Sequence, residues 1–478
     1  MAEDPPRYRF GPRSTRGLVA GWSGGQLASV AVAVVIALGV LKSVGGIVGA
    51  GVALAIVGVG LAVSSWPVAG RPVQSWLPTA ARYAVDVAAD GRLEPWKSSR
   101  ARRRTRCLDR LSVRAVSPDE DRSFGVVVDD DGSTWSAAVP VGGLGYALSD
   151  ERGRAEAVAA WAGVLAAMAA DQRDLVRLQW IARTYPACLD GPTEVTRPPA
   201  PTGRHAKGRT APFAARAYER FVEETAARLW NREVLVVLST RAPRQAPTSR
   251  ANGAGESEAA RRLARLCDLL AERLAASGLA AGHPLEVVGL VSALRRAYDL
   301  DGPVAAPSWP FPIGVEPRWA SLRTDGCFHV TYWVSEWPRS EVGPGVLLPL
   351  LIGSGRRRTV AVTMAPLGPL AAVRRAERER TSGAADAELR RRHGFAATAR
   401  ARAEQDLRAQ REAELAEGHA AYLFSGYVTV TAADEASLEK SCAEVEQAAA
   451  LARLELRRLY GAQEAAWCCT LPAGRGCG

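Results

Sequence analysis

Residues 24–65 read GGQLASVAVAVVIALGVLKSVGGIVGAGVALAIVGVGLAVSS and contain one ionisable side chain, Lys42. A helix needs about 20 mainly apolar residues to cross a bilayer, because each residue rises about 1.5 Å against a hydrocarbon core of about 30 Å. The runs 24–41 and 44–65 are both long enough, and Lys42-Ser43 leaves almost no loop between them. The sequence therefore predicts a two-helix transmembrane hairpin over residues 24–66.

Basic residues flank this predicted hairpin on both sides, whereas its turn carries only Lys42. Lys and Arg are enriched in cytoplasmic loops, so we expect a multi-pass plasma-membrane protein with a cytoplasmic N-terminal segment (1–23) and a cytoplasmic C-terminus. Trp22 and Trp66 are expected to anchor the hairpin at one membrane interface. Gly45 and Gly49 have the GxxxG spacing, which lets helix backbones approach closely, either within the hairpin or between molecules.

A basic segment follows the hairpin, within a predicted juxtamembrane linker at residues 67–115. Residues 97–110 hold seven Lys and Arg against one acid, Asp109. Near a membrane such residues attract anionic lipid with about 1 kcal/mol each. DNA is the alternative partner, although no aromatic residues alternate with the arginines to stack on bases. The candidate contacts with lipid or DNA are Lys97, Arg100, Arg102, Arg103, Arg104 and Arg106.

The remaining chain has the composition of a globular body, with 47% hydrophobic and 23% charged residues. Residues 116–300 and 301–478 both show strands and helices in the order ββαβαβ, so we predict an α+β fold of two ferredoxin-like units with long helical insertions. The predicted strands are 124–128, 134–141, 175–185, 233–239, 327–337, 358–365, 422–431 and 454–459. The predicted helices are 150–170, 213–230, 256–277, 370–417 and 434–450.

The region at about 370–417 in the second unit is densely charged and is expected to form a helical arm. Opposite charges four residues apart, such as Glu404 and Arg408, support an exposed helix. Ser382-Gly383 and Gly394 are expected to break it into pieces. The arm is either a solvated helix or a docking surface for a partner.

Aromatic residues mark a second candidate surface. Tyr332, Trp333 and Trp337 lie on one predicted strand, with Tyr332 on the face opposite the two tryptophans. One face is expected to belong to the core, and the other is a candidate partner surface.

Catalytic motifs are absent from the sequence. No Gly-rich loop precedes any of the four Lys in the P-loop pattern, and the single G-x-S-x-G, at residues 21–25, opens an apolar helix instead of joining a strand to a helix. The five His do not cluster, and no C-x-x-C occurs. We therefore expect a protein that is not an enzyme and that has no catalytic, metal or cofactor site. The role of Cys468, Cys469 and Cys477 stays open.

Several strings carry a resemblance to a known family. They are RYRFGP at 7–12, RTDG at 323–326, YWVSEWP at 332–338 and AAYLFSGYVTV at 420–430. With them the chain resembles actinobacterial integral membrane proteins of a type IV secretion-like, conjugation-related gene cluster. The hairpin also resembles the PrgI-type membrane subunit of type IV secretion. The stretch 456–472, with Tyr460-Gly461, Gln463, Trp467 and Leu471-Pro472, is similar to the end of the N-terminal domain of the accessory secretion ATPase.

The resemblance implies a non-catalytic inner-membrane subunit of a type IV secretion-like apparatus, because the chain ends where the motor domain of that ATPase would begin. It would dock or organise a separate secretion ATPase, contact other membrane subunits and form an oligomer within the complex. The alternatives are a membrane-tethered DNA-binding protein and a membrane enzyme of unknown chemistry.

Overall fold

The chain contains two compact units. The computed structural model describes Tyr8, Phe10 and residues 24–65, 67–68, 71–72, 76–90, 107–108, 110–129, 134–142, 146, 148–170, 174–186, 230–241, 252–299, 310–338, 340–352, 355–392, 399–417 and 419–476. The first unit comprises Met1–Arg9, Arg100–Gly368 and Ala420–Gly478, and the second comprises Phe10–Ser99 and Pro369–His419. The units are treated separately below.

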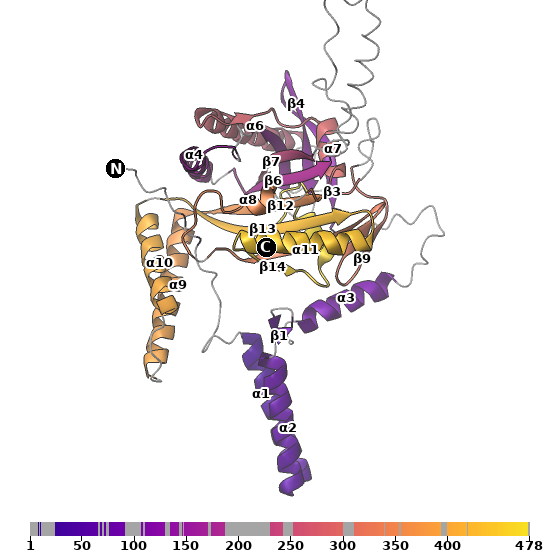
Figure 1. Cartoon of the computed structure of the whole chain (residues 1–478), viewed down its shortest axis with the longest axis vertical. Helices are drawn as coiled ribbons and strands as arrows, with labels where there is room; N and C mark the ends of the chain where they lie inside the picture. Colours follow the sequence, from indigo (N-terminus) through magenta and orange to yellow (C-terminus); the bar gives the residue numbers. More distant parts are fainter. Residues whose placement is uncertain are drawn as a thin grey trace, which may run out of the picture. The chain divides into compact units, whose positions relative to one another are not determined.

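An antiparallel sheet organises the first unit (Figure 1). Its strands are β3 (Leu111–Asp119), β4 (Arg122–Asp129), β5 (Thr134–Gly142), β6 (Arg177–Pro186), β7 (Trp230–Arg241), β8 (Ala280–Ala281), β9 (Val315–Pro317), β10 (Leu322–Thr324), β11 (Cys327–Glu336), β12 (Arg358–Leu367), β13 (Ala421–Ala432) and β14 (Glu455–Arg458). Its helices are α4 (Glu151–Ala170), α6 (Asn252–Ala276), α7 (Val287–Arg295), α8 (Leu348–Ile352), α11 (Glu435–Leu451) and α12 (Gln463–Cys468).

The strand order is symmetric about the pair β6–β12. Across the sheet it runs β3-β4-β5-β7-β6-β12-β13-β11-β10-β9, with β8 beside β5 and β14 beside β11. One half of the sheet has the spatial order β8-β5-β7-β6, and the other half has the order β14-β11-β13-β12. When the four strands of a half are numbered along the chain, both orders read 4-1-3-2, which is the ferredoxin-like arrangement. The halves join because β6 pairs with β12 from Leu178↔Met364 to Thr184↔Arg358. The predicted division at residues 116–300 and 301–478 stays a prediction.

The two faces of the sheet differ in what covers them. Alternate residues of each strand point to opposite faces, so Val126 and Val128 pack with α4 and α6, whereas Val127 packs with α7. We call the side covered by α4, α6, α8 and α11 the helix face. We call the other side, covered by α7, α12 and the segments 296–299 and 469–476, the polar face, because buried polar side chains gather there.

Local sequence signals explain individual elements of this unit. The stripe Leu263, Leu266, Leu270 and Leu274 is completely buried on one side of α6, as its three- and four-residue spacing predicts. The side chain of Asp434 caps α11 by accepting a hydrogen bond from the Ser437 amide at 2.9 Å. The other predicted strands and helices of this unit are confirmed within a few residues at their ends, except the predicted helix 213–230, of which residues 213–229 lie outside the described residues.

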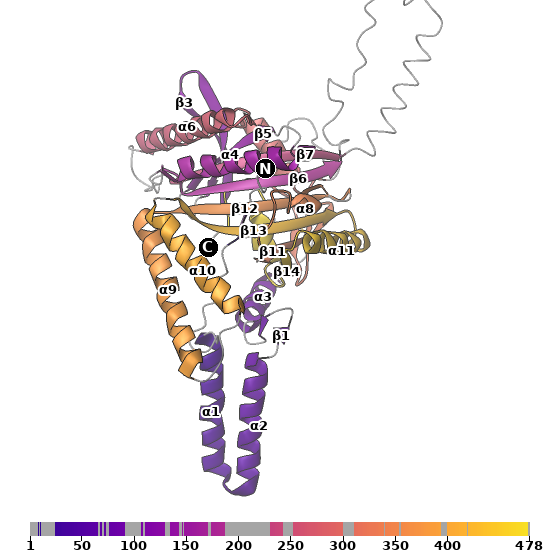
Figure 2. The same ribbon diagram turned by 60° about the vertical axis from the view of Figure 1, so that its left-hand side comes forward.

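The second unit contains two pairs of helices. α1 (Gly24–Val44) and α2 (Gly46–Ser65) run side by side (Figure 2), joined by Gly45 and Gly46 with φ of +58° and +66°. These left-handed backbone angles suit glycine, which has no Cβ to clash. α9 (Pro369–Arg392) pairs with α10 (Ala399–Ala416). The unit also contains the short pair β1 (Pro67–Val68) and β2 (Arg71–Pro72), and α3 (Leu77–Asp90).

The predicted fold class, an α+β body behind a two-helix transmembrane hairpin, is wrong in its hairpin. Among the helices that the structure describes, none has both the length and the apolar character that crossing a bilayer requires. The predicted multi-pass localisation in the plasma membrane with cytoplasmic termini is wrong for the same reason. The prediction rested on the scarcity of charge over residues 17–70, which is a weaker condition than a spanning helix.

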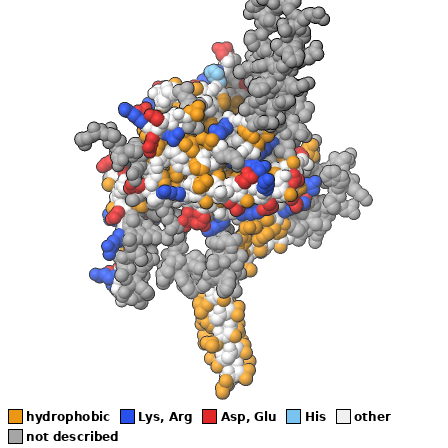
Figure 3. Space-filling view, viewed as in Figure 1, with side chains coloured by type: hydrophobic (Ala, Val, Ile, Leu, Met, Phe, Trp, Pro, Cys, Tyr) orange, Lys and Arg blue, Asp and Glu red, His pale blue; other side chains and the backbone are white. Residues whose placement is uncertain are grey.

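Small residues hold α1 and α2 together. A Cβ at Gly60 would lie 2.5 Å from the Cβ of Ala33, so the helices touch there without room for a side chain. Large apolar side chains instead face outward, with Ile47 93% and Leu54 77% exposed, and Figure 3 shows hydrophobic side chains along the hairpin.

Replacing Gly60 with leucine is expected to destabilise the helix pair by about 1–3 kcal/mol, because the side chain overpacks the contact with Ala33. Hydrogen exchange of amides 24–65, followed by mass spectrometry, would then become faster. Gly58→Leu is the matched control, since a Cβ at Gly58 meets nothing within 4 Å. Equal exchange in the two variants would contradict the proposed contact.

Candidate functional site: a buried polar cluster at the central strand pair

The segment 469–476 crosses the polar face at one end of the β6–β12 pair. Gln179 on β6 donates from Nε2 to the Cys469 carbonyl at 2.8 Å and accepts from the Gly474 amide at 2.9 Å. Thr363 on β12 donates to the Arg475 carbonyl at 2.9 Å. Gly474 has a φ of +62°, and a Cβ there would lie 2.0 Å from Ser239 Oγ, so this close approach requires glycine.

An arginine cluster occupies the other end of the same strand pair. Arg183 on β6 donates from Nη1 to Glu233 Oε2 at 3.1 Å and to the Ala293 carbonyl at 2.7 Å. Arg296, just after α7, donates to Glu233 Oε1 at 2.7 Å. Arg357 donates from Nη2 to the Asp299 carbonyl at 2.6 Å and also to the Arg296 carbonyl. The cluster therefore ties the segment 296–299 to β6, β7 and the start of β12.

Two of these guanidinium groups are almost fully enclosed. Arg183 is 1% exposed and Arg357 is 7% exposed. Burial lowers the pKa of Arg183, and it lowers the pKa of Arg357 to about 10. Both groups still carry a full positive charge at neutral pH, so the polar face holds buried charge that must be balanced.

A neutral histidine network lies next to the cluster. His329 on β11 is completely buried; its Nε2 hydrogen-bonds with Thr324 Oγ1 at 2.8 Å and its Nδ1 with Thr431 Oγ1 at 2.9 Å. Burial, with a smaller contribution from Arg357, lowers the pKa of His329 to about 3. The thiol of Cys327 donates to the Tyr298 carbonyl at 2.6 Å. These bonds fix the neutral imidazole between β10 and β13.

The structure separates the aromatic residues of the predicted partner surface. Tyr332 is 1% exposed in the core of the helix face, and its hydroxyl donates to Glu446 Oε1 at 2.7 Å. Trp333 is half-buried on the opposite face of β11. Trp337 packs edge-on against Phe424, with ring centroids 5.4 Å apart, and Phe424 is 40% exposed. Only the two tryptophans keep surface that a partner could reach.

The remaining candidate residues are placed as follows. Gly45 lies in the turn between α1 and α2, and a Cβ added at Gly49 would lie at ordinary van der Waals distance from Val44 at the end of α1. Trp22, Trp66 and the basic residues Lys97, Arg100, Arg102, Arg103, Arg104 and Arg106 lie outside the described residues, so their contacts stay predictions.

The C-terminal cysteines fall in different surroundings. The thiols of Cys107 and Cys468 influence each other, and this interaction lowers the pKa of Cys107 and raises the pKa of Cys468. Cys469 donates from Sγ to the Ala465 carbonyl at 3.3 Å, and Cys477 lies outside the described residues. In the described part of the chain no group of three or more metal-ligating side chains is arranged to hold a metal ion.

Sequence reasoning did not single out Arg183, Glu233 or Arg357. A signal was present in β6, where Gln179, Ile181 and Arg183 alternate with Leu178, Trp180 and Ala182. Both sets are largely buried, so Arg183 stands at a core position of a strand that is covered on both faces. An arginine at such a position indicates a buried polar partner.

Part of this site lies in a stretch of the chain that is similar to a family of secretion-system components. Residues 229–334 match the family described as putative type VII ESX secretion system translocon, EccE. The matched stretch includes Glu233, Arg296 and His329, whereas Arg183 and Arg357 lie outside it. A search of curated proteins found no match.

This similarity points to a secretion system and corrects the predicted type. The type IV and PrgI-like assignments are wrong, because the matching family belongs to type VII secretion. The predicted resemblance is right only in the coarser sense of a secretion-system component.

Proposed function

We propose that this chain is a non-catalytic structural subunit of a type VII secretion apparatus, and that it docks or organises a separate ATPase of that apparatus. The match of residues 229–334 carries the proposal. It runs from β7 through α6 and α7 into β11, so it covers strands on either side of the central pair β6–β12, and part of the arginine cluster.

The internal hydrogen bonds of the sheet support a structural role. Gln179, Thr363 and Arg183 use their polar groups to fix the segments 469–476 and 296–299. Such bonds rigidify a body that has to hold other subunits in register.

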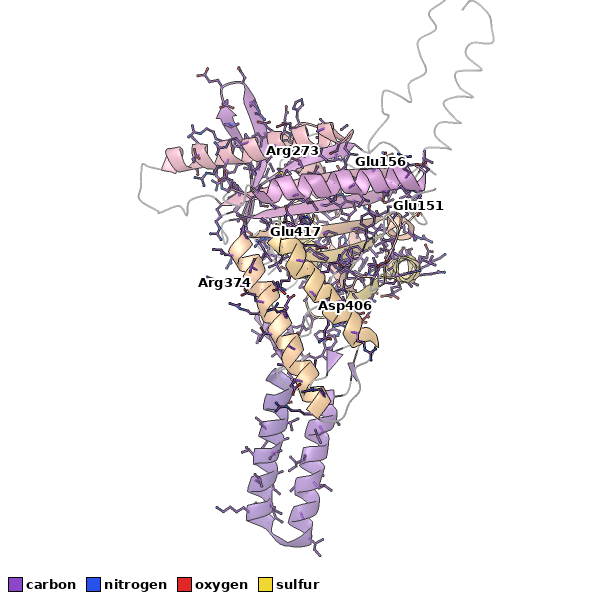
Figure 4. The ribbon with its side chains drawn as sticks, turned by 90° about the vertical axis from the view of Figure 1, so that its left-hand side faces the viewer. Glu151, Glu156, Arg273, Arg374, Asp406 and Glu417 are labelled. Carbon is purple, nitrogen blue, oxygen red and sulfur yellow. The ribbon has the colours of Figure 1, made fainter. Side chains whose placement is uncertain are left out.

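The helical arm, α9 and α10, is the surface we propose for docking. It is an insertion between β12 and β13, where Leu367 pairs directly with Ala421. Arg380 on α9 binds both carboxylate oxygens of Glu412 on α10, at 2.9 and 3.0 Å. Arg374 and Asp406 are further charged residues of the arm, labelled in Figure 4. Exposed charges of both signs suit a partner surface of complementary charge.

The test removes the arm without cutting the sheet. Because Leu367 and Ala421 are paired, Asn-Gly in place of residues 368–420 closes a two-residue hairpin. We expect the variant to keep the thermal stability of the sheet and to lose co-purification of the secretion ATPase. The matched control replaces residues 187–229 with Asn-Gly between Pro186 and Trp230, which are also paired.

Three outcomes would contradict the proposal, each in a different part. If the armless variant still retains the ATPase, the arm is not the docking surface. If the unaltered chain, purified with its secretion machinery expressed, brings down no other component of that machinery, the structural role itself is rejected. ATP hydrolysis by the isolated chain would reject the non-catalytic part.

A further inference from the structure

Three buried guanidinium nitrogens of Arg183 and Arg357 lack a hydrogen-bond partner among the described residues. They are Nε and Nη2 of Arg183 and Nη1 of Arg357. Leaving a buried charged donor unsatisfied costs more than about 1–3 kcal/mol. Native proteins rarely tolerate this, so each such group calls for a ligand or an ordered water molecule.

The unpaired edge of Arg183 has the geometry for two oxygens of one anion. Its Nη1 is occupied by Glu233 and the Ala293 carbonyl, whereas Nε and Nη2 remain. In the planar guanidinium these two N–H groups point in parallel along one edge, which is the fork that binds carboxylate and phosphate in a bidentate manner.

Arg357 lies next to Arg183 on the same face of the sheet. Arg183 pairs with Thr359 across the β6–β12 junction, and Arg357 stands two residues before Thr359. Such diagonal neighbours have backbones about 7–8 Å apart, within reach of two arginine side chains. The positive charge of Arg183 also lowers the pKa of Arg357, which agrees with their closeness.

Among the described contacts, the two carboxylates of this place bind Arg183, Arg295 and Arg296, and the guanidinium of Arg357 binds backbone carbonyls. The guanidinium groups of Arg183, Arg295, Arg296 and Arg357 face the carboxylates of Glu233 and Asp299. Glu233 is shared by Arg183 and Arg296, and Asp299 pairs with Arg295 at 2.8 Å. Arg357 contacts only the backbone carbonyls of Arg296 and Asp299.

We propose that Arg183 and Arg357 bind a small oxyanion of the phosphate class, held between β6 and the start of β12. The Nε and Nη2 groups of Arg183 bind two of its oxygens, and Nη1 of Arg357 binds a further oxygen. Because the donors are enclosed, we assign the site to a free inorganic ion and not to a macromolecular surface. The inference does not depend on the proposed function in secretion.

The test measures phosphate binding to the purified full chain by equilibrium dialysis with radiolabelled phosphate. We expect one phosphate per chain, and an upward shift of the thermal midpoint in phosphate relative to chloride at equal ionic strength. Phosphate also stabilises folded proteins by exclusion from their surface. Specific binding is therefore measured as the difference in the phosphate-induced shift of the thermal midpoint between the unaltered chain and its variants.

Arg183→Lys is the first variant, because it keeps the positive charge and one donor for Glu233 but removes the bidentate edge. We expect it to weaken phosphate binding by at least about tenfold. Arg357→Gln is the second variant and serves if the first fails to fold. Arg122→Gln is the matched control, since Arg122 forms an exposed ion pair with Asp268 and lies outside the cluster.

The outcomes divide cleanly. Loss of bound phosphate and of the extra thermal shift in both cluster variants, but not in Arg122→Gln, supports the site. Equal phosphate binding in the unaltered chain and Arg183→Lys overturns it and leaves ordered water as the partner of these nitrogens. Binding of acetate without binding of phosphate overturns the assignment to the phosphate class.

Discussion

Replacing Trp467 with alanine is expected to lower the free energy of unfolding of the first unit, which contains the large sheet and is called the sheet unit below, by about 3–5 kcal/mol. Trp467 on α12 is 1% exposed and belongs to the core of the polar face. Its ring lies 5.3 Å from the ring of His329 and meets Tyr298 edge-on at 6.5 Å. Removing it leaves a cavity beneath α12 and loosens the start of the segment 469–476.

Urea unfolding followed by circular dichroism would measure this loss. Trp467→Phe is the control, because it keeps an aromatic ring and removes an indole N–H that has no hydrogen-bond partner among the described residues. We expect it to cost much less than alanine. A loss below about 1 kcal/mol for Trp467→Ala would mean that α12 contributes little to the core.

Acid is expected to destabilise the sheet unit through His329. The unfolded chain protonates this residue below about pH 6.5, whereas the buried side chain, with a pKa of about 3, stays neutral. The unfolded state therefore binds more protons between these values, and the free energy of unfolding falls as the pH falls from about 6.5 towards 3. The slope from this residue approaches about 1.4 kcal/mol per pH unit.

His329→Gln isolates that contribution, because glutamine keeps hydrogen bonds to threonine hydroxyls but does not titrate. Carboxylates also destabilise folded proteins at low pH, so the informative quantity is the difference in slope between the two chains. Chemical unfolding at a series of pH values would give it. Equal slopes in both chains would show that His329 takes up a proton in the folded state without penalty.

The local elements of the sheet unit were predictable, and their pairing was not. Alternation and apolar stripes mark β4, β11 and α6 because burial imposes a period on the sequence nearby. The pairing of β6 with β12 joins Thr184 to Arg358 across a long stretch of chain, and no local pattern encodes it. The sequence predicted two units and could not indicate that their edge strands would merge.

The sequence analysis overestimated the effect of single helix-breaking residues in the helical arm. α9 runs through Ser382-Gly383 as one helix of 24 residues, so the predicted break there is wrong. One glycine costs a helix about 1 kcal/mol relative to alanine, which neighbouring turns and the pairing with α10 offset. Gly394 and the side chains of Glu404 and Arg408 fall outside what the structure describes.

The candidate site was hidden for a different reason. Catalytic motifs are recognised by fixed spacing, whereas Arg183, Glu233 and Arg357 come from three strands or their ends and meet only in the folded sheet. The placement of Tyr332 and Trp333 on opposite faces of the strand was predictable, because neighbouring residues of a strand alternate between its faces. Tyr332 turns into the core, while Trp333 points to the other face.

The symmetric join at β6 and β12 also determines how this chain tolerates being cut. A fragment that stops before residue 310 would keep β6 but lose β12, and β6 would then become an edge strand with a row of unpaired amides and carbonyls. Exposed edge strands of that kind pair with strands of other chains. Either half produced alone should therefore tend to self-associate, and soluble material should return when the complementary half is supplied in trans.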